Sequence, residues 1–225
     1  MVETKSPETQ NINQPYNCKV CGKSCNAIYC CRDCMLEDKA PGLIDRAGLN
    51  RGLYGSMELD NFNWNDITTR QKAENYLKET ISNKPADRKG LYLFGSVGVG
   101  KTHLAIAIAK YIIRQTGLQA RIITVPDLLS GMFGKGDSFD KIVQPLIDIP
   151  ILVLDDLGSE NISAWSISLV CQLLDTRLVN GQLTYITSNL NPNHVLKDMD
   201  ARVISRIYGM CETMLLEGID ARTKR

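Results

Sequence analysis

Residues 95–102 fit the phosphate-binding loop motif G-x-x-x-x-G-K-[ST] at each of its fixed positions. Glycines allow backbone N–H groups to converge on phosphate oxygens, Lys101 places a cation beside them, and the Thr102 hydroxyl can bind Mg²⁺. Residues 91–94 before the motif read as a buried strand, and residues 103–110 after it read as an apolar helix that begins at the phosphate. This order of strand, loop and helix predicts a site for a nucleoside triphosphate and Mg²⁺. The residues predicted to contact the nucleotide here are Gly95, Ser96, Val97, Gly98, Val99, Gly100, Lys101, Thr102 and His103.

Short apolar runs alternate with helical patterns from residue 90 onward. The runs at 91–94, 121–125, 151–154, 183–187 and 214–216 predict five strands. Strands separated by helices favour the α/β class, with a doubly wound and mostly parallel sheet. Ligands of such sheets bind at the carboxyl ends of the strands, which is where the loop at 95–102 lies.

Two adjacent acids end the apolar run at 151–154. Asp155 is placed to hold Mg²⁺ through water, and Asp156 is placed to orient or deprotonate an attacking water. The alternative is a strand that simply ends in a solvated turn. Because the phosphate loop requires such an acidic partner, we favour the catalytic interpretation.

Further polar residues lie near the ends of later elements. Asn189 follows the strand predicted at 183–187 and is a candidate to reach the γ-phosphate or the attacking water, although Asn also ends many strands. Arg202 and Arg206 are four residues apart on one helical face, so one of them can deliver a cation to a neighbouring subunit's phosphate. Arg222 is a third candidate cation. Solvated surface arginines are the alternative for all three.

Six of the eight cysteines lie between positions 18 and 34, a clustering that favours metal binding over disulfides. Cys18 and Cys21 form a tight knuckle, and a second pair follows, either Cys30 with Cys34 or Cys31 with Cys34. Two pairs of thiolates make a tetrahedral zinc site, whose binding energy would fold a segment too small for a core. The spacing of Cys30 and Cys34 resembles MYND-like knuckles, so the predicted ligands are Cys18, Cys21, Cys30 and Cys34.

Charge and hydropathy exclude some classes. The formal net charge is +1, so no global positive field indicates a nucleic-acid partner, although a local basic patch remains compatible with one. The N-terminus lacks the pattern of a secretory signal, and no run approaches the roughly 18 apolar residues of a membrane span. We therefore expect a cytoplasmic protein with no membrane partner.

The motifs together resemble the DnaC/DnaI/IstB branch of the AAA+ ATPases. The resemblance covers about residues 50–225 and depends on three runs in order: "GKTHLA" from Gly100, "DDLG" from Asp155 and "TSN" from Thr187, with Trp165 and the Arg202/Arg206 pair in support. It implies an AAA+ fold that binds ATP and Mg²⁺. It also implies roles for Asn189 as first sensor, Arg206 as arginine finger and Arg222 as second sensor. The second acid is Asp here, where many AAA+ proteins carry Glu.

The resemblance also implies a function. Members with an N-terminal zinc module load a replicative helicase onto single-stranded DNA, so we expect an ATP-hydrolysing, oligomeric helicase loader with the helicase and DNA as partners. Two alternatives stay open, an IstB-like transposition helper and a weakly hydrolysing adaptor that holds nucleotide. A predicted loop at 130–136 offers Phe133 for stacking on a base and Lys135 for a phosphate, or merely anchors a surface loop.

Four segments are expected along the chain. Residues 1–16 are polar and read as a disordered leader, and residues 17–40 form the zinc-binding module. Residues 41–88 form a linker with a helix from about 69 to 81. Residues 89–225 form the AAA+ ATPase domain.

Overall fold

The computed structural model describes residues 16–18, 21–25, 31–84, 87–134, 139–158, 164–192 and 201–220. The helices are α1 (Arg32–Arg46), α2 (Ile67–Ser82), α3 (Lys101–Thr116), α4 (Val125–Gly134), α5 (Phe139–Asp148), α6 (Ala164–Val179) and α7 (Ala201–Met210), with a 3-10 helix, η1, at Gly52–Ser56. The strands are β1 (Tyr16–Asn17), β2 (Ser24–Cys25), β3 (Gly90–Phe94), β4 (Ala120–Thr124), β5 (Ile151–Leu157), β6 (Leu183–Ser188) and β7 (Cys211–Leu215).

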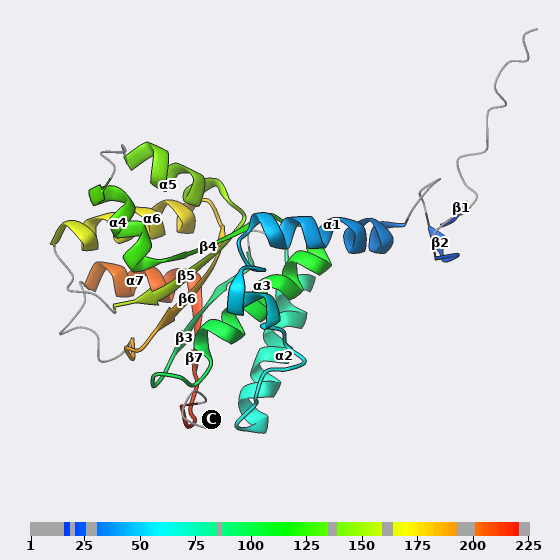
Figure 1. The fold of residues 1–225 in the computed structure, drawn as a ribbon, viewed down its shortest axis with the longest axis horizontal. Helices are drawn as coiled ribbons and strands as arrows, with labels where there is room; N and C mark the ends of the chain where they lie inside the picture. The colour runs from blue at the N-terminus through cyan, green and yellow to red at the C-terminus, as the bar shows by residue number, and fades with distance from the viewer. Residues whose placement is uncertain are drawn as a thin grey trace, which may run out of the picture.

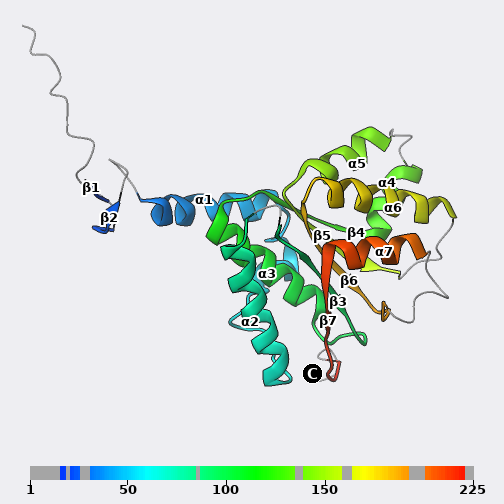
Figure 2. The same cartoon turned by 180° about the vertical axis from the view of Figure 1, so that it is seen from behind.

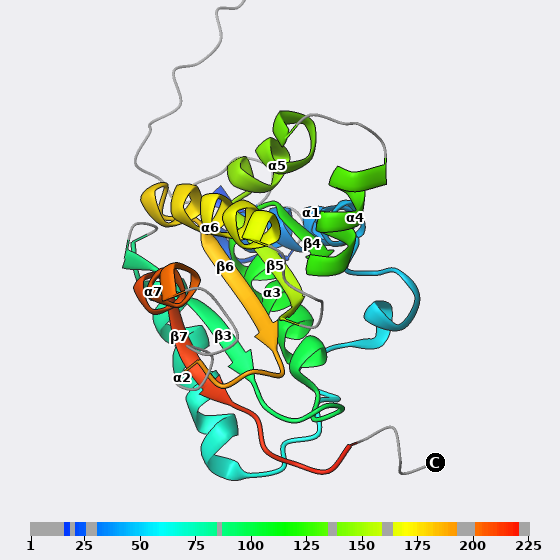
Figure 3. The ribbon, with the colours of Figure 1, turned by 90° about the vertical axis from the view of Figure 1, so that its left-hand side faces the viewer.

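Strands β3 to β7 form one parallel sheet in the order β4-β5-β6-β3-β7. All five expected strands are present, which confirms the predicted α/β fold. Because parallel neighbours need crossover connections, helices cover both faces of the sheet. Figure 3 shows β4 and β7 at opposite edges, with α6 and α7 in front of the sheet.

Alternate side chains of each strand enter two separate cores. Leu91 and Leu93 of β3 pack with α1, α2 and α3, whereas Tyr92 and Phe94 pack with α4 to α7. The same alternation holds along β5, because successive strand residues point to opposite faces. The result is three layers, which Figure 1 and Figure 2 show from opposite sides.

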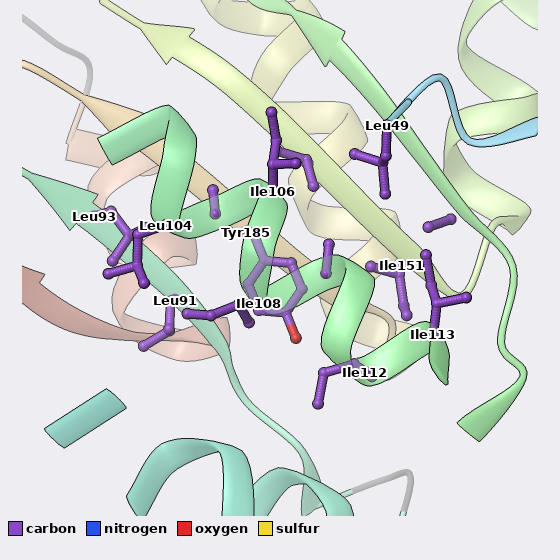
Figure 4. Packing of buried hydrophobic residues seen from close by; sticks show 14 of the residues in the cluster. Leu49, Leu91, Leu93, Leu104, Ile106, Ile108, Ile112, Ile113, Ile151 and Tyr185 are labelled. Atoms are coloured by element: carbon purple, nitrogen blue, oxygen red, sulfur yellow. The ribbon is translucent and has the colours of Figure 1, made fainter. Parts of the chain in front are cut away.

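Helix α3, which begins in the phosphate loop, lies at the centre of the first core. Leu104, Ile108 and Ile112 are fully buried there, and Figure 4 shows Ile108 beside the ring of Tyr185 from β6. Each such side chain contributes about 1.5–3 kcal/mol of burial free energy. The Tyr76 hydroxyl on α2 donates to the Tyr185 hydroxyl at 3.3 Å, so these two buried polar groups are partners. The phosphate loop is therefore joined to a helix with little freedom to move.

A buried lysine on α3 holds the segment that precedes α2. Lys110 is 1% exposed, and its ammonium donates to the carbonyl oxygens of Tyr54 at 2.8 Å and Met57 at 3.0 Å. Glu58 accepts from Lys110 at 3.3 Å and forms two hydrogen bonds with Arg114. Burial of an ammonium group requires such partners. The carbonyls of η1 are thus fixed to α3.

A buried arginine joins α5, α6 and β6 on the opposite face. Arg177 is fully buried, and its guanidinium donates to the carbonyl oxygens of Leu146, Ile149 and Leu183 and to the hydroxyl of Thr184. Burial lowers the pKa of Arg177 to about 9, so the group remains a cation at neutral pH. The acceptors from α5 are the carbonyls that a helix leaves unpaired at its C-terminal end, where a cation is favourable.

Two expectations about local structure change. Residues 130–134, predicted as part of a loop, form the end of α4, because the apolar positions Val125, Leu128 and Leu129 drive a helix through the glycines. The side chain of Phe133 and all of Lys135 lie outside the described residues. Helix α1 runs across the expected module boundary at residue 40. No helix among the described residues has the length and apolar character needed to cross a membrane.

Candidate functional site

Residues 95–100 form a loop between β3 and α3, and the conformation of this loop depends on its glycines. Gly98 and Gly100 have φ angles of 77° and 97°, which L side chains rarely adopt. A Cβ atom on Gly98 would lie 1.8 Å from Oδ1 of Asp220, and one on Gly100 would lie 2.9 Å from the ring of Phe62. The loop backbone therefore carries no side chain at these two positions, and Asp220 and Phe62 pack against it. It fits the phosphate cradle that the motif predicts.

The amino end of α3 opens into this loop. Gly100 caps the helix without a side-chain hydrogen bond, so the first helical N–H groups face the loop, as phosphate binding requires. Lys101 is 6% exposed and donates to the carbonyl oxygens of Gly95 at 3.0 Å and Ser96 at 2.6 Å. Val97 is exposed at the loop surface, and Val99 is buried below it. The cation is thus held within the loop.

The structure brings the loop and the acidic strand together across 53 residues of sequence. The Thr102 hydroxyl donates to Oδ1 of Asp155 at 2.8 Å, and the Thr187 hydroxyl donates to the same oxygen at 2.6 Å. Asp155 is 3% exposed, and burial raises the pKa of its carboxyl, whereas the two hydroxyl donors lower it. Hard oxygen ligands beside a phosphate cradle are the donor set that Mg²⁺ takes. These residues therefore fit the predicted metal.

A β-bulge places the second acid. Leu154 pairs with Ile186 and Leu157 with Ser188, so Asp155 and Asp156 together face one residue, Thr187, on β6. Asp156 takes a left-handed φ of 60°, and its N–H donates to the Thr187 hydroxyl at 3.0 Å. Its side chain is exposed at the carboxyl edge of the sheet.

Thr187 is the functional residue that sequence reasoning missed. Its hydroxyl accepts from the backbone of Asp156 and donates to the carboxylate of Asp155, so one side chain positions both acids. The signal was present, because Thr187 opens the run that ends in Asn189. The sequence signal was a hydroxyl residue at the end of the strand predicted at 183–187, and the structure shows this residue fully buried.

His103 lies beside the lead-in segment. Its Nε2 is 2.9 Å from the carbonyl oxygen of Glu58 and 3.1 Å from Oδ1 of Asn61. Its ring packs edge-on against Phe62 with centroids 5.2 Å apart. The imidazole therefore ties the residues before α2 to the first turn of α3, and a direct contact of His103 with nucleotide stays a prediction.

The predicted sensor and finger residues lie at different places. Asn189 directly follows β6 and is exposed, at the same edge of the sheet as the acids. Arg206 on α7 forms an ion pair with Asp175 on α6, through Nε at 2.6 Å and Nη2 at 3.1 Å. Arg222 lies outside the described residues. The roles of these three residues stay predictions.

Four cysteine sulfurs meet at the N-terminal end of α1. The Sγ atoms of Cys18, Cys21, Cys31 and Cys34 all lie within 4.8 Å of one another. The separations are 3.9 Å between Cys18 and Cys34 and 3.6 Å between Cys21 and Cys31. A tetrahedral zinc with bonds of about 2.3 Å sets its sulfurs roughly 3.8 Å apart, so the four thiols fit this ion. The predicted ligand Cys30 lies outside the described residues, and Cys31 supplies the fourth sulfur of this cluster.

Backbone hydrogen bonds shape the cluster. The N–H of Gly22 donates to the carbonyl oxygen of Cys18, and the N–H of Cys18 donates to that of Lys23, both at 2.8 Å. The N–H of Cys31 donates to Sγ of Cys18 at 3.2 Å. A thiolate accepts such a bond more strongly than a thiol, as zinc ligation requires. Figure 1 shows β1 and β2 beyond the N-terminal end of α1, away from the sheet.

Exchange of single cysteines tests the ligand set. We expect one zinc ion per chain, loss of that zinc in Cys31→Ser, and full zinc content in the matched control Cys30→Ser, because only the former removes a sulfur of the described cluster. Elemental analysis of the purified variants measures this. Zinc retained by Cys31→Ser and lost by Cys30→Ser would contradict the assignment and restore the ligand set predicted from the sequence.

Comparison with known proteins gives consistent matches over the sheet and its helices. The model of a family described as IstB-like ATP binding protein matches residues 58–224. The replicative helicase loader DnaC of Escherichia coli strain K12 is 27% identical over 172 residues, which are 73% of this chain and 67% of that protein. The replicative helicase loader DnaI of Bacillus subtilis strain 168 is 26% identical over 205 residues, 83% of this chain and 64% of that protein. A crystal structure of the DnaC helicase loader is similar with a TM-score of 0.62 and 29% identity, over 72% of this chain and 97% of that one.

Proposed function

The chain belongs to the IstB-like family of ATP-binding proteins, within the AAA+ P-loop ATPases, and from this premise we propose that it is an ATP-dependent helicase loader. In this proposal the protein binds a replicative helicase and delivers it onto single-stranded DNA. Relatives named as replicative helicase loaders, DnaC and DnaI, support this choice. Self-association into an oligomer, in which one subunit completes the ATP site of the next, is part of the proposal.

The observation that carries the proposal is the junction of Thr102, Asp155 and Thr187. A phosphate loop without an acidic partner would hold a nucleotide but would have no group to position a metal. Here one buried carboxylate oxygen meets two hydroxyl groups directly beside the loop. Bound Mg²⁺ would supply positive charge to the phosphates of ATP. Thr102 and Asp155 would hold this ion.

The other side chains take roles set by their positions. Lys101 lies within the loop as a cation for the phosphates of ATP. Asp156 stands exposed at the edge of the sheet, where it would orient the attacking water and accept its proton. Its backbone bond to Thr187 keeps this carboxylate beside Asp155. Asn189 at the same edge would sense the γ-phosphate.

The zinc module supports the loader over a transposition helper. Four thiols that fit zinc at one end of α1 form a small unit separate from the two cores. Such a unit offers a surface for a protein partner. We assign this surface to the helicase.

A reconstituted loading reaction tests the proposed function. The host's replicative helicase, this protein and ATP are combined with circular single-stranded DNA coated with single-strand binding protein, and the helicase on the DNA is counted after gel filtration. We expect loading to require this protein, and Asp156→Asn to bind ATP but fail to sustain repeated rounds. Absence of any complex with the helicase would contradict the proposal. Stimulation of a transposase instead would indicate the transposition helper.

A further inference from the structure

A basic pocket lies at the β4 edge of the sheet, next to the strand that carries Asp155. Three arginines line it: Arg46 at the end of α1, Arg51 directly before η1, and Arg121 on β4. The cavity has a volume of about 310 Å³. Tyr54 and Thr124 also line the cavity. Segments far apart in the sequence therefore bring three guanidinium groups to one place.

The arginines that line this pocket outnumber the acids that line it. All three arginines are exposed, and within the described part of the chain none of them forms an ion pair. Asp127 is the single acid among the lining residues that the structure describes. A protein with a net charge of +1 thus gathers three unpaired cations around one cavity. An anion is the ligand that such a cavity attracts.

The frame of the pocket is fixed by backbone contacts. The N–H of Ile122 on β4 donates to the carbonyl oxygen of Ala47 at 3.1 Å, which joins the end of α1 to the edge strand. The carbonyl oxygen of Tyr54 accepts from the buried Lys110 at 2.8 Å. The arginines therefore extend from a rigid support, so ligand binding does not have to order the backbone.

The chemistry of the wall favours one kind of anion. A planar guanidinium matches the oxygens of a phosphate, and three of them match a chain of phosphates better than a single one. The half-buried ring of Tyr54 lies in the same wall, and aromatic rings beside basic groups accept the unstacked bases of single strands. In a duplex the bases are stacked inside the helix and do not reach such a ring.

We propose that this pocket binds the phosphodiester backbone of single-stranded DNA, with a base placed against Tyr54. The assignment rests on the proposed function, because it locates the DNA that the loader engages. The pocket also adjoins the ATP site, since Thr124 on its wall pairs in register with Asp155. DNA in this pocket therefore lies one strand away from the acidic centre.

Charge-matched variants test the pocket. The triple variant Arg46→Ala/Arg51→Ala/Arg121→Ala removes the three guanidinium groups, and Arg70→Ala/Lys72→Ala/Lys78→Ala removes three exposed cations from α2. Figure 3 shows α2 near β7 and α1 near β4, the strands at opposite edges of the sheet. Fluorescence anisotropy with a labelled oligothymidylate measures affinity at several salt concentrations.

We expect the pocket variant to bind the oligonucleotide about tenfold more weakly at moderate salt and the α2 variant to bind like the wild type. Loss of three phosphate contacts should lower the slope of log affinity against log salt by about 2. Tyr54→Leu should weaken binding while leaving this slope unchanged. Pyrophosphate should compete only at concentrations far above those of the oligonucleotide.

Several outcomes would overturn the proposal. These are equal affinity of the pocket variant and the wild type, equal losses in both triple variants, preference for duplex over single-stranded DNA, and equal competition by pyrophosphate. ATP binding and the helicase complex are measured on the same samples. If both persist while the wild type fails to bind DNA, the pocket assignment fails and the ATPase and helicase parts of the proposed function stand.

Discussion

Lys101→Ala should bind ATP on the order of 100-fold more weakly than the wild type, and it should show no ATP turnover. The side chain is 6% exposed, and its ammonium lies on the carbonyl oxygens of Gly95 and Ser96 inside the loop. Alanine removes the cation that faces the phosphates and leaves these two carbonyls without their donor. Both changes act at the same place, so the loss of affinity should be larger than for any exposed lysine.

Isothermal titration calorimetry with Mg²⁺ and ATP measures this loss. Lys72→Ala, an exposed lysine on α2, is the control for the removal of one positive charge. Thermal unfolding of both variants without nucleotide shows whether the fold is retained, and we expect a cooperative transition in each, at a somewhat lower temperature for Lys101→Ala because two carbonyl oxygens lose their donor. Wild-type affinity of a folded Lys101→Ala protein would contradict the assignment of the loop as the ATP site.

Arg206→Ala should retain ATP binding but lose about 1000-fold in turnover, if this arginine acts on the site of a neighbouring subunit. In the single chain its guanidinium is bound to Asp175 on α6. A purely structural role through this ion pair is the competing explanation. The pair lies at the surface, with side chains 27% and 47% exposed, so its own contribution to stability is small.

Asp175→Asn separates the two explanations. It removes the ion pair but keeps the guanidinium, so turnover should stay within a few-fold of the wild type if Arg206 serves a neighbour. Equal losses in Asp175→Asn and Arg206→Ala would show that the pair is structural. A mixture of Lys101→Ala and Arg206→Ala chains should regain part of the activity, because one chain supplies the loop and the other supplies the arginine.

The central site could be predicted from the sequence because its key groups lie in short contiguous motifs. The phosphate loop and the acid pair each follow a run of apolar residues, so strand and site were found together. The central strands β3, β5 and β6 were predicted for the same reason, since buried parallel strands read as apolar runs. The junction of Thr102 with Asp155 then followed from the rule that sites form at carboxyl ends of strands.

Features that depend on tertiary contacts were not predictable. Helix α1 contains Pro41 and is polar along much of its length, so its apolar side was recognised only where it packs on α3. Residues 130–134 carry two glycines, and only their place at the end of the amphipathic α4 made them helical. The partner of Arg206 could not be read from the chain because it lies 31 residues away, on another helix.

The ligands of the cysteine cluster could be predicted only in part. Cys31 and Cys34 repeat the two-residue spacing of Cys18 and Cys21, and this repetition was a usable signal for the fourth sulfur. The neighbouring Cys30 made two pairings compatible with the sequence. The bond from the Cys31 N–H to Cys18 Sγ is a geometric fact that spacing does not encode.

The left-handed backbone conformation at residue 156 favours the shorter Asp over Glu. A residue with φ of 60° in the bulge must tolerate a conformation that Asp adopts several-fold more readily than most side chains. Glutamate, the acid that many AAA+ proteins carry here, would gain reach toward water but would strain the main chain by about 1 kcal/mol or more. The departure from the family pattern is therefore a conformational compromise, in which local geometry rather than reactivity selects the side chain.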